Sequence, residues 1–192
     1  MFQYPAQLRL DARMDDTAIV RAAINEYPDF PKAGIRFQDV FGIFSKPAAH
    51  QSLHNLMVGH AKQHQDTVDV VVGLDARGFL LGPAMALAIG KPFVPVRKAG
   101  KLPGACLGRS YSLEYGEDRL EVQEGSIRSG ARALIVDDLL ATGGTLKTAA
   151  SLVREAGGEV AHCWVLVELA ALGGRARVGE EVKALITMED VE

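Results

Sequence analysis

Four short runs of mainly apolar, often β-branched residues recur along the chain, and helical patterns separate several of them. The runs are VDVVVGL (68–74), PFVPV (92–96), ALIVDD (133–138) and EVAHCWVLVEL (159–169). The helical patterns lie at 15–27, 47–65, 78–89 and 144–156. Strands and helices that alternate in this way form a parallel sheet covered by helices. The sequence therefore predicts an α/β fold with a parallel-rich central sheet and helices on both faces.

The length suits one domain, because 192 residues, 48% of them apolar, can bury a single core. No repeat or interdomain linker is visible, so we expect residues 1–192 to form one domain. Residues 1–45 are less regular, and we expect this segment to form a small N-terminal hood over the site. The segment 97–118 contains four glycines and a proline. A long irregular segment in a compact domain is commonly a lid or a binding loop, and we expect a flexible lid.

Composition excludes several classes of protein. The formal net charge of −3 provides no bulk positive field, so nucleic acid is not an expected partner. The two cysteines, Cys106 and Cys163, do not suggest a disulfide framework or a metal site, which favours a reducing compartment. The amino terminus, MFQYPAQLRLDARMDD, lacks the pattern of a signal peptide, and the longest apolar stretch, FLLGPAMALAIG, is too short to span a bilayer. We therefore expect a cytoplasmic protein without membrane contact.

Two aspartates and a pair of glycines follow the apolar run that starts at Ala133. Asp137 and Asp138 emerge at the carboxyl end of the predicted strand, where open α/β sheets bind ligands. The segment 141–145, ATGGT, then turns into a helix, and Gly-Gly lets successive backbone N–H groups bind a phosphate there. The turn is not a nucleoside-triphosphate P-loop, because it has no lysine. Carboxylates are acceptors that suit vicinal hydroxyls, so phosphate and diol together indicate ribose 5-phosphate. The alternative is an ordinary turn in which aspartate caps the helix.

Several motifs together resemble one enzyme family. They are FPKAGIRFQDV, GLDARGFLLGP, RKAGKLPG, SYSLEYG, VDDLLATGGT and LVEL, in the family's order over about residues 28–172. On these motifs the chain resembles the type I phosphoribosyltransferases, and within them the adenine phosphoribosyltransferases. The resemblance implies the fold of that family and a reversible transfer of 5-phosphoribose from phosphoribosyl diphosphate to adenine, which gives AMP and diphosphate. It also implies a homodimer and Mg²⁺ that enters mainly with the diphosphate, so that no protein metal ligands are expected.

The resemblance also assigns roles to individual residues. Glu114 is expected to exchange a proton at the purine ring, a contribution worth roughly 10²–10⁴-fold in rate. Arg77, in the turn after the first strand, is expected to hold the diphosphate, and Phe37 is expected to lie against adenine. The full set of substrate contacts that the resemblance implies is Asp137, Asp138, Ala141, Thr142, Gly143, Gly144, Thr145, Arg77, Arg97, Lys98, Lys101, Tyr115, Phe37, Gln38 and Leu169.

Two positions in the hood depart from the family pattern. Gln38 stands where arginine is usual, and Arg36 stands where an apolar residue is usual. Base contacts made through the backbone around Phe37 survive such changes, whereas contacts through these side chains do not. The carboxyl-terminal segment EVKALITMEDVE departs as well. Two alternatives therefore stay open: a transferase for hypoxanthine, guanine or xanthine, and a non-catalytic regulator that senses phosphoribosyl diphosphate. The second would need a nucleic-acid surface, and the sequence has no basic stripe that indicates one.

Overall fold

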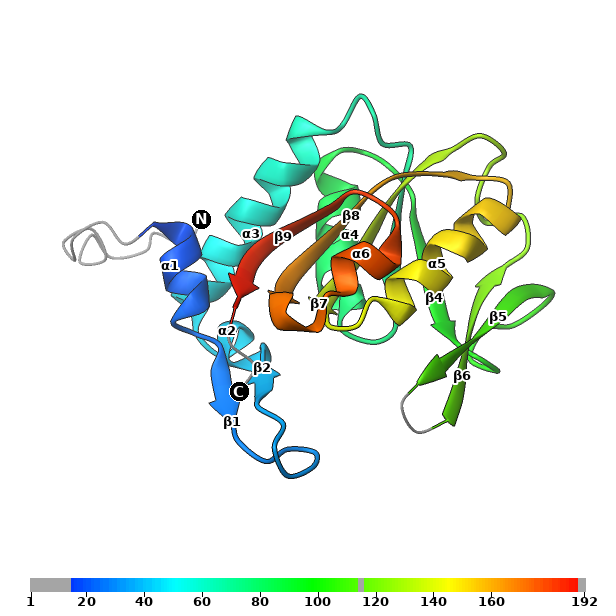
Figure 1. Ribbon diagram of the computed structural model, residues 1–192. Helices are drawn as coiled ribbons and strands as arrows, with labels where there is room; N and C mark the ends of the chain where they lie inside the picture. The colour runs from blue at the N-terminus through cyan, green and yellow to red at the C-terminus, as the bar shows by residue number, and fades with distance from the viewer. Residues whose placement is uncertain (1–14, 114–115, 190–192) are drawn as a thin grey trace.

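A seven-stranded sheet forms the centre of the computed structural model, which describes residues 15–113 and 116–189 (Figure 1). The strand order is β5-β6-β4-β3-β7-β8-β9. The strands are β3 (Val70–Leu74), β4 (Phe93–Lys98), β5 (Cys106–Leu113), β6 (Gly116–Gln123), β7 (Arg132–Leu140), β8 (Glu159–Leu169) and β9 (Val182–Met188). The five strands from β4 to β9 in this order are parallel to their neighbours, and β5 and β6 extend the sheet in antiparallel pairing. The predicted parallel-rich α/β fold is confirmed.

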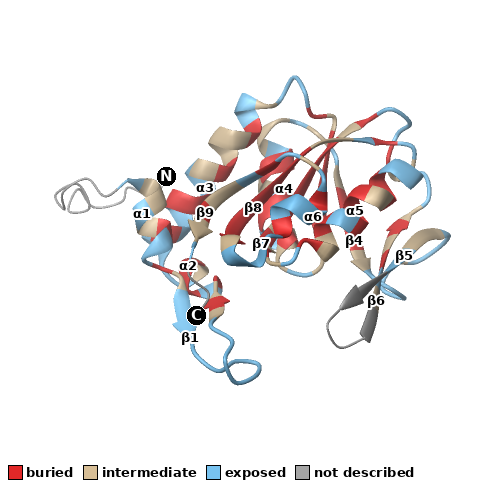
Figure 2. Cartoon of the chain, in the orientation of Figure 1, coloured by how far each residue is buried: buried red, intermediate tan, exposed pale blue. Residues whose placement is uncertain are grey.

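Helices cover both faces of this sheet and bury two separate apolar cores. Helices α3 (Pro47–Gln63) and α4 (Gly78–Ala88) pack on one face with the short α1 (Asp16–Arg21). On the other face lies α5 (Gly144–Glu155), beside α6 (Gly174–Val178). Figure 2 shows the buried residues concentrated in the sheet and on the inner sides of these helices. Because β3 and β7 are covered on both sides, all of β3 and residues 133–136 of β7 are apolar or glycine and buried.

The described part of the hood differs from the sequence prediction. The helical pattern at 15–27 ends as a helix at Arg21, and Asn25–Tyr27 forms strand β1 instead. Strand β1 pairs antiparallel with β2 (Phe37–Asp39), and the one-turn helix α2 (Phe41–Phe44) follows. Pro28 comes directly after Tyr27, and the residue before a proline is disfavoured in the helical conformation. The two strands form a small sheet apart from the central one (Figure 1).

The segment 97–118 contains more regular structure than its glycine content predicts. Half of its length, residues 106–113 and 116–118, lies in the hairpin of β5 and β6, whose register runs from Cys106 opposite Gln123 to Leu113 opposite Gly116. Gly108 belongs to that hairpin, and the guanidinium of Arg119 lies where a Cβ of residue 108 would stand. The glycine therefore serves side-chain packing across the hairpin rather than an irregular loop. Whether the segment moves as a lid stays a prediction.

The last strand, β9, and the short elements before it are also additions to the sequence prediction. β9 pairs in parallel with β8 at one edge of the sheet, and a 3₁₀ helix (Ala170–Leu172) leads from β8 towards α6. Among the described residues, no helix is both long and apolar enough to cross a lipid bilayer.

Candidate active site

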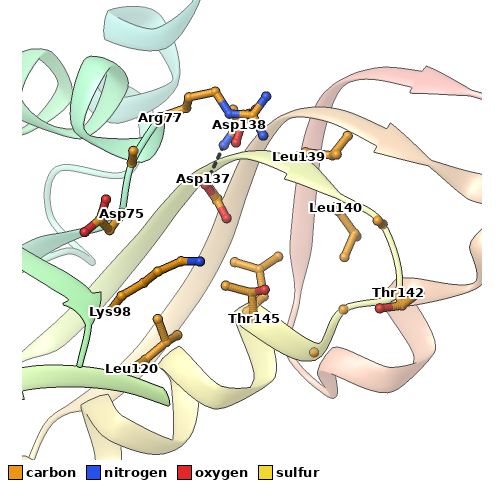
Figure 3. Close-up of a pocket in the computed structure, with 15 residues that line it drawn as sticks. Asp75, Arg77, Lys98, Leu120, Asp137, Asp138, Leu139, Leu140, Thr142 and Thr145 are labelled. Atoms are coloured by element: carbon orange, nitrogen blue, oxygen red, sulfur yellow. Dashed lines mark hydrogen bonds and ion pairs between the residues drawn. The ribbon is translucent and has the colours of Figure 1, made fainter. Parts of the chain in front are cut away.

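A cavity of about 260 Å³ opens at the carboxyl ends of β3 and β7 (Figure 3). Three segments of the chain supply most of its wall: the turn after β3, the end of β7, and the loop that leads into α5. Its lining residues are Asp75, Ala76, Arg77, Lys98, Leu120, Asp137, Asp138, Leu139, Leu140, Ala141, Thr142, Gly143, Gly144, Thr145 and Leu146. The structure thus brings nine of the sequence-predicted contact residues to one cavity: Arg77, Lys98, Asp137, Asp138 and all five residues of 141–145.

The loop 141–145 has a backbone shape that only glycine accommodates at its centre. Gly143 is left-handed, with φ of 82°, and a Cβ there would lie 2.4 Å from the backbone oxygen of Gly174. Helix α5 begins at the next residue, and no side chain caps its first turn. The unpaired N–H groups of that turn and the positive end of the helix dipole therefore face the cavity. Thr142 and Thr145 line the same wall. This arrangement fits a phosphate group.

The paired aspartates occupy the opposite wall of the cavity. The backbone N–H of Asp138 donates to Oδ1 of Asp137 at 2.9 Å. Burial raises the pKa of both carboxyls; the neighbouring Asp138 raises the pKa of Asp137 further, while the guanidinium of Arg77 opposes the rise. In Figure 3 the carboxyl of Asp137 and the ammonium of Lys98 point into the same space. Two carboxyls held in this way are acceptors for the hydroxyl groups of a bound sugar.

Arg77 stands between these aspartates and the hood. Its Nε lies 3.0 Å from Oδ2 of Asp138, whose side chain is only 6% exposed. That oxygen accepts no hydrogen bond of good geometry from the described residues, so the ion pair leaves it unsatisfied. The guanidinium carbon of Arg77 also lies 6.0 Å from the ring centre of Phe37. A planar cation placed here suits an anion bound between the sugar site and the hood.

The basic residues of 97–101 have different surroundings. Nε of Arg97 donates to Oδ2 of Asp75 at 2.9 Å, which ties the end of β4 to the turn after β3. Lys98 lines the cavity, and its Nζ lies 3.0 Å from a carboxylate oxygen of Asp118 on β6. Lys101 is exposed and does not line the cavity, although its backbone oxygen accepts a hydrogen bond from Arg97. The structure thus brings one of the three predicted cations, Lys98, into the cavity wall.

A second, more apolar cavity of about 450 Å³ lies in the hood. Its lining residues are Tyr27, Pro28, Asp29, Phe30, Phe37 and Asp39. The rings of Phe30 and Phe37 meet edge to face with their centres 5.0 Å apart. Sequence analysis selected only Phe37 from this set. The available signal for the others was the pair of aromatic residues that flank Pro28 and Asp29 in YPDF.

Gln38 is not brought into that cavity. Residues alternate across β2, so Phe37 and Asp39 line the cavity while Gln38 is 8% exposed and faces the other way. Its Nε2 donates to a carboxylate oxygen of Glu26 at 3.1 Å, and Arg36 lies 3.4 Å from the other oxygen of the same carboxylate. The two residues that depart from the family pattern are thus partners of one glutamate on β1.

Three further residues were predicted to contact substrate or act in catalysis. Glu114 and Tyr115 lie outside the described residues. Leu169, at the end of β8, is buried in the core beneath α3 and α4 and lines neither of the two cavities described above.

Comparisons with known proteins agree with this geometry. A family model described as the phosphoribosyl transferase domain matches residues 43–190. The chain is 51% identical to adenine phosphoribosyltransferase from Caenorhabditis elegans over 155 residues, which are 81% of this chain and 84% of the relative. It is 45% identical to adenine phosphoribosyltransferase from Shewanella loihica over 179 residues, 93% of this chain and 97% of the relative. The crystal structure of the Saccharomyces cerevisiae adenine phosphoribosyltransferase, in complex with adenine and an imino-altritol bisphosphate, is similar, with a TM-score of 0.84 and 40% identity. That match covers 88% of this chain and 98% of the yeast chain.

Proposed function

This chain belongs to the adenine phosphoribosyltransferase family, and we propose on that premise that it converts adenine and 5-phosphoribosyl 1-diphosphate to AMP and diphosphate in purine salvage. One observation carries the proposal for this chain's own residues. Arg77 contacts both the carboxylate wall of the sugar cavity, through Asp138 at 3.0 Å, and the aromatic wall of the hood cavity, through Phe37 at 6.0 Å. A donor and a base bound in these two cavities would meet beside it.

The donor takes the cavity at the edge of the sheet. Its 5-phosphate accepts hydrogen bonds from the backbone N–H groups of Gly143 and Gly144, which the left-handed turn aims at the cavity. The ribose hydroxyls donate to Asp137 and Asp138. Burial raises the pKa of both carboxyls because it disfavours their charged form, and hydrogen bonds from the ribose hydroxyls would offset that cost. The diphosphate then lies at Arg77.

Magnesium is proposed to enter with the donor. The cavity fits this, because the carboxylates of Asp75, Asp137 and Asp138 line it and Oδ2 of Asp138 accepts no hydrogen bond from the described residues. Mg²⁺ prefers oxygen ligands, and it commonly binds through one or two carboxylates plus substrate phosphates. When bound it supplies charge neutralisation to the diphosphate leaving group. The carboxylates of this chain orient the ribose and the hydrated ion that the diphosphate carries.

The base takes the hood cavity, against the ring of Phe37. In the transfer, N9 of adenine forms a bond to C1 of the ribose, and the bond from C1 to the diphosphate oxygen breaks with its electron pair on the diphosphate. The N9 proton passes to Glu114 and then to solvent. Because Gln38 is turned towards Glu26, the amino edge of adenine is read by backbone groups of β2. A backbone carbonyl there would accept from the 6-amino group and would repel the oxygen of a 6-oxopurine.

The segment 97–118 is proposed to close over the bound donor. Lys98 in the cavity wall and the adjoining β5–β6 hairpin support this, since β6 of the hairpin pairs with the end of β4 that carries Lys98. Closure would exclude water from the reacting ribosyl centre. Limited proteolysis tests the proposal: donor with Mg²⁺ should protect this segment, and equal cleavage with and without donor would exclude a lid.

A homodimer is proposed from the composition of α4, GFLLGPAMALA. This helix is apolar all round, yet Leu80 and Leu87, seven residues apart, are 45% and 84% exposed. A helix that is apolar on every face is normally buried, so a second copy of the chain is the partner that we propose. Leu87→Glu should then yield monomers in light scattering.

The two cysteines are free, which supports the proposal of a cytoplasmic location.

The experiment that tests the proposed function measures AMP and diphosphate from adenine, donor and Mg²⁺, with hypoxanthine and guanine as competing bases. We expect equimolar AMP and diphosphate, and specificity constants that favour adenine by up to roughly 10⁴-fold, because a site built on a hydrogen bond discriminates that strongly. Turnover of hypoxanthine at a similar rate would replace adenine with another purine as the substrate. Donor binding without turnover of any base would support the regulator.

A further inference from the structure

Three histidines form a cluster at the end of the sheet away from the proposed active site. His60 and His64 lie at the carboxyl-terminal end of α3, and His162 lies near the start of β8. Each offers one ring nitrogen, and these three nitrogens all lie within 4.8 Å of one another. We call these residues the histidine cluster. His162 pairs in register with Leu134 of β7, three residues before Asp137, so the cluster lies towards the amino ends of the parallel strands.

The local structure aims all three rings at one point. His60 and His64 are four residues apart, which places them on one face of a helix. Residues alternate across β8: Cys163 packs in the core on the α5 side, whereas Trp164 packs in the core beneath α3. His162, two residues before Trp164, therefore faces α3, and it is only 4% exposed. The ring centres lie 4.5–5.1 Å apart in the three pairs.

The residue types suit a ligand set, because imidazole nitrogens are common ligands of transition metal ions. The charged groups near these rings are Glu181, just before β9, and Lys183, within it. The two side chains form an ion pair with each other at 2.6 Å.

The geometry needs only small side-chain rotations to take a metal ion. Nε2 of His60 and Nε2 of His162 lie 2.9 Å apart. Two nitrogens on a tetrahedral zinc ion, each at about 2.0–2.1 Å, lie roughly 3.3 Å apart. The first pair must therefore open slightly, and the ring of His64 must close in from within 4.8 Å. His60 and His64 are partly exposed, so one side of the cluster is open to solvent and leaves room for a water ligand.

We propose that His60, His64 and His162 form a three-histidine site for a divalent transition metal ion, with Zn²⁺ as its occupant and water in the fourth position. Imidazole ligands select Zn²⁺, Cu²⁺ and Ni²⁺ over Mg²⁺, which prefers oxygen. The site is therefore chemically distinct from the carboxylate-lined cavity. It fastens the end of α3 to β8, so the ion stabilises the fold rather than taking part in phosphoribosyl transfer.

The test uses the full chain without a polyhistidine tag, stripped with a chelator and kept in excess Mg²⁺ to occupy carboxylate sites. Titration calorimetry with Zn²⁺ should give one ion per chain. Zn²⁺ at 100 times its dissociation constant should raise the melting temperature by roughly 5–10 °C. Co²⁺ in the same site should give the intense visible bands of a four-coordinate nitrogen environment.

Two variants of the same helix separate the site from general surface binding. His64→Ala removes one ligand and should weaken Zn²⁺ binding by more than the roughly 10–100-fold that loss of an outer-shell partner costs. His54→Ala is the matched control, because His54 is exposed on α3 and does not belong to the cluster. It should bind Zn²⁺ like the wild type. His64→Gln, with a circular dichroism spectrum, guards against misfolding of the alanine variant. Less than one tightly bound ion in the wild type, or equal binding by the wild type and folded His64 variants, would overturn the proposal.

Discussion

Replacing Gly143 with alanine tests whether the shape of the loop 141–145 creates the phosphate site. At φ of 82° a residue with a Cβ is strained, which costs about 1–2 kcal/mol in a left-handed conformation. The new Cβ would also lie 2.4 Å from the backbone oxygen of Gly174, far inside van der Waals contact. Overpacking of this kind typically costs about 1–3 kcal/mol. We therefore expect Gly143→Ala to lower the free energy of unfolding by about 2–5 kcal/mol in total.

Gly130→Ala is the control for this change. Gly130 has a similar φ of 72°, but, apart from its chain neighbours, no atom of the described residues lies within 4 Å of the position that its Cβ would take. It precedes β7, at the end of the strand far from the cavity. This variant should lose only the conformational part, about 1–2 kcal/mol. Urea denaturation measures both stabilities.

Donor affinity separates the two variants further. The clash forces the loop 141–145 to shift, which misaligns the N–H groups of its helix end. Since a hydrogen bond to a charged group contributes about 1.5–3 kcal/mol, Gly143→Ala should weaken donor binding at least tenfold by calorimetry. Gly130→Ala should bind donor like the wild type. Equal destabilisation of the two variants together with unchanged donor affinity would refute the argument that this turn builds the phosphate site.

Three other predictions follow from the same site. Asp137→Asn should weaken donor binding yet raise the melting temperature of the ligand-free protein at neutral pH, because it removes a buried charge. The pKa of Asp137 is raised in the folded state, so the folded protein binds a proton at this carboxyl more tightly than the unfolded chain and the wild type gains stability as pH falls. The melting-temperature advantage of Asp137→Asn should therefore shrink at acidic pH. An advantage that stays constant with pH would contradict the raised pKa. Gln38→Arg should leave the adenine-to-hypoxanthine ratio of kcat/KM nearly unchanged, because Gln38 faces Glu26; a large rise in that ratio would show that its amide reads the base. Glu114→Gln should lower kcat far more than it weakens adenine binding, and kcat retained within a few-fold would make Glu114 an orienting residue.

The central parallel strands could be predicted because burial on both faces leaves a strong local pattern. All five residues of Val70–Leu74 are apolar or glycine and all are buried. The hood strand Asn25–Tyr27 leaves no such pattern, since its three residues are exposed and β2 is its only sheet partner among the described residues. The β5–β6 hairpin was missed for a related reason: its glycines indicate a loop, and its strands form by pairing with each other and with the end of β4. These strands are determined by pairing with residues distant in the sequence, and a local sequence pattern carries no information on such pairing.

The candidate site shows the same division. Residue types and spacing in VDDLLATGGT were enough to predict that Asp137, Asp138 and the loop 141–145 lie together at the carboxyl ends of the strands, because strand ends and helix starts are local features. The contact of Arg77 with Phe37, and the turn of Gln38 towards Glu26, depend on where the hood packs. Sequence reasoning could name these residues but could not orient their side chains.

A crystal structure with 5-phosphoribosyl 1-diphosphate and Mg²⁺ tests the central claim most directly, because it locates each group of the donor. We expect the 5-phosphate on the backbone N–H groups of Gly143 and Gly144, the ribose hydroxyls on Asp137 and Asp138, and the diphosphate beside Arg77. A donor bound in the reverse direction, with its diphosphate on the glycine loop and its 5-phosphate at Arg77, would contradict it.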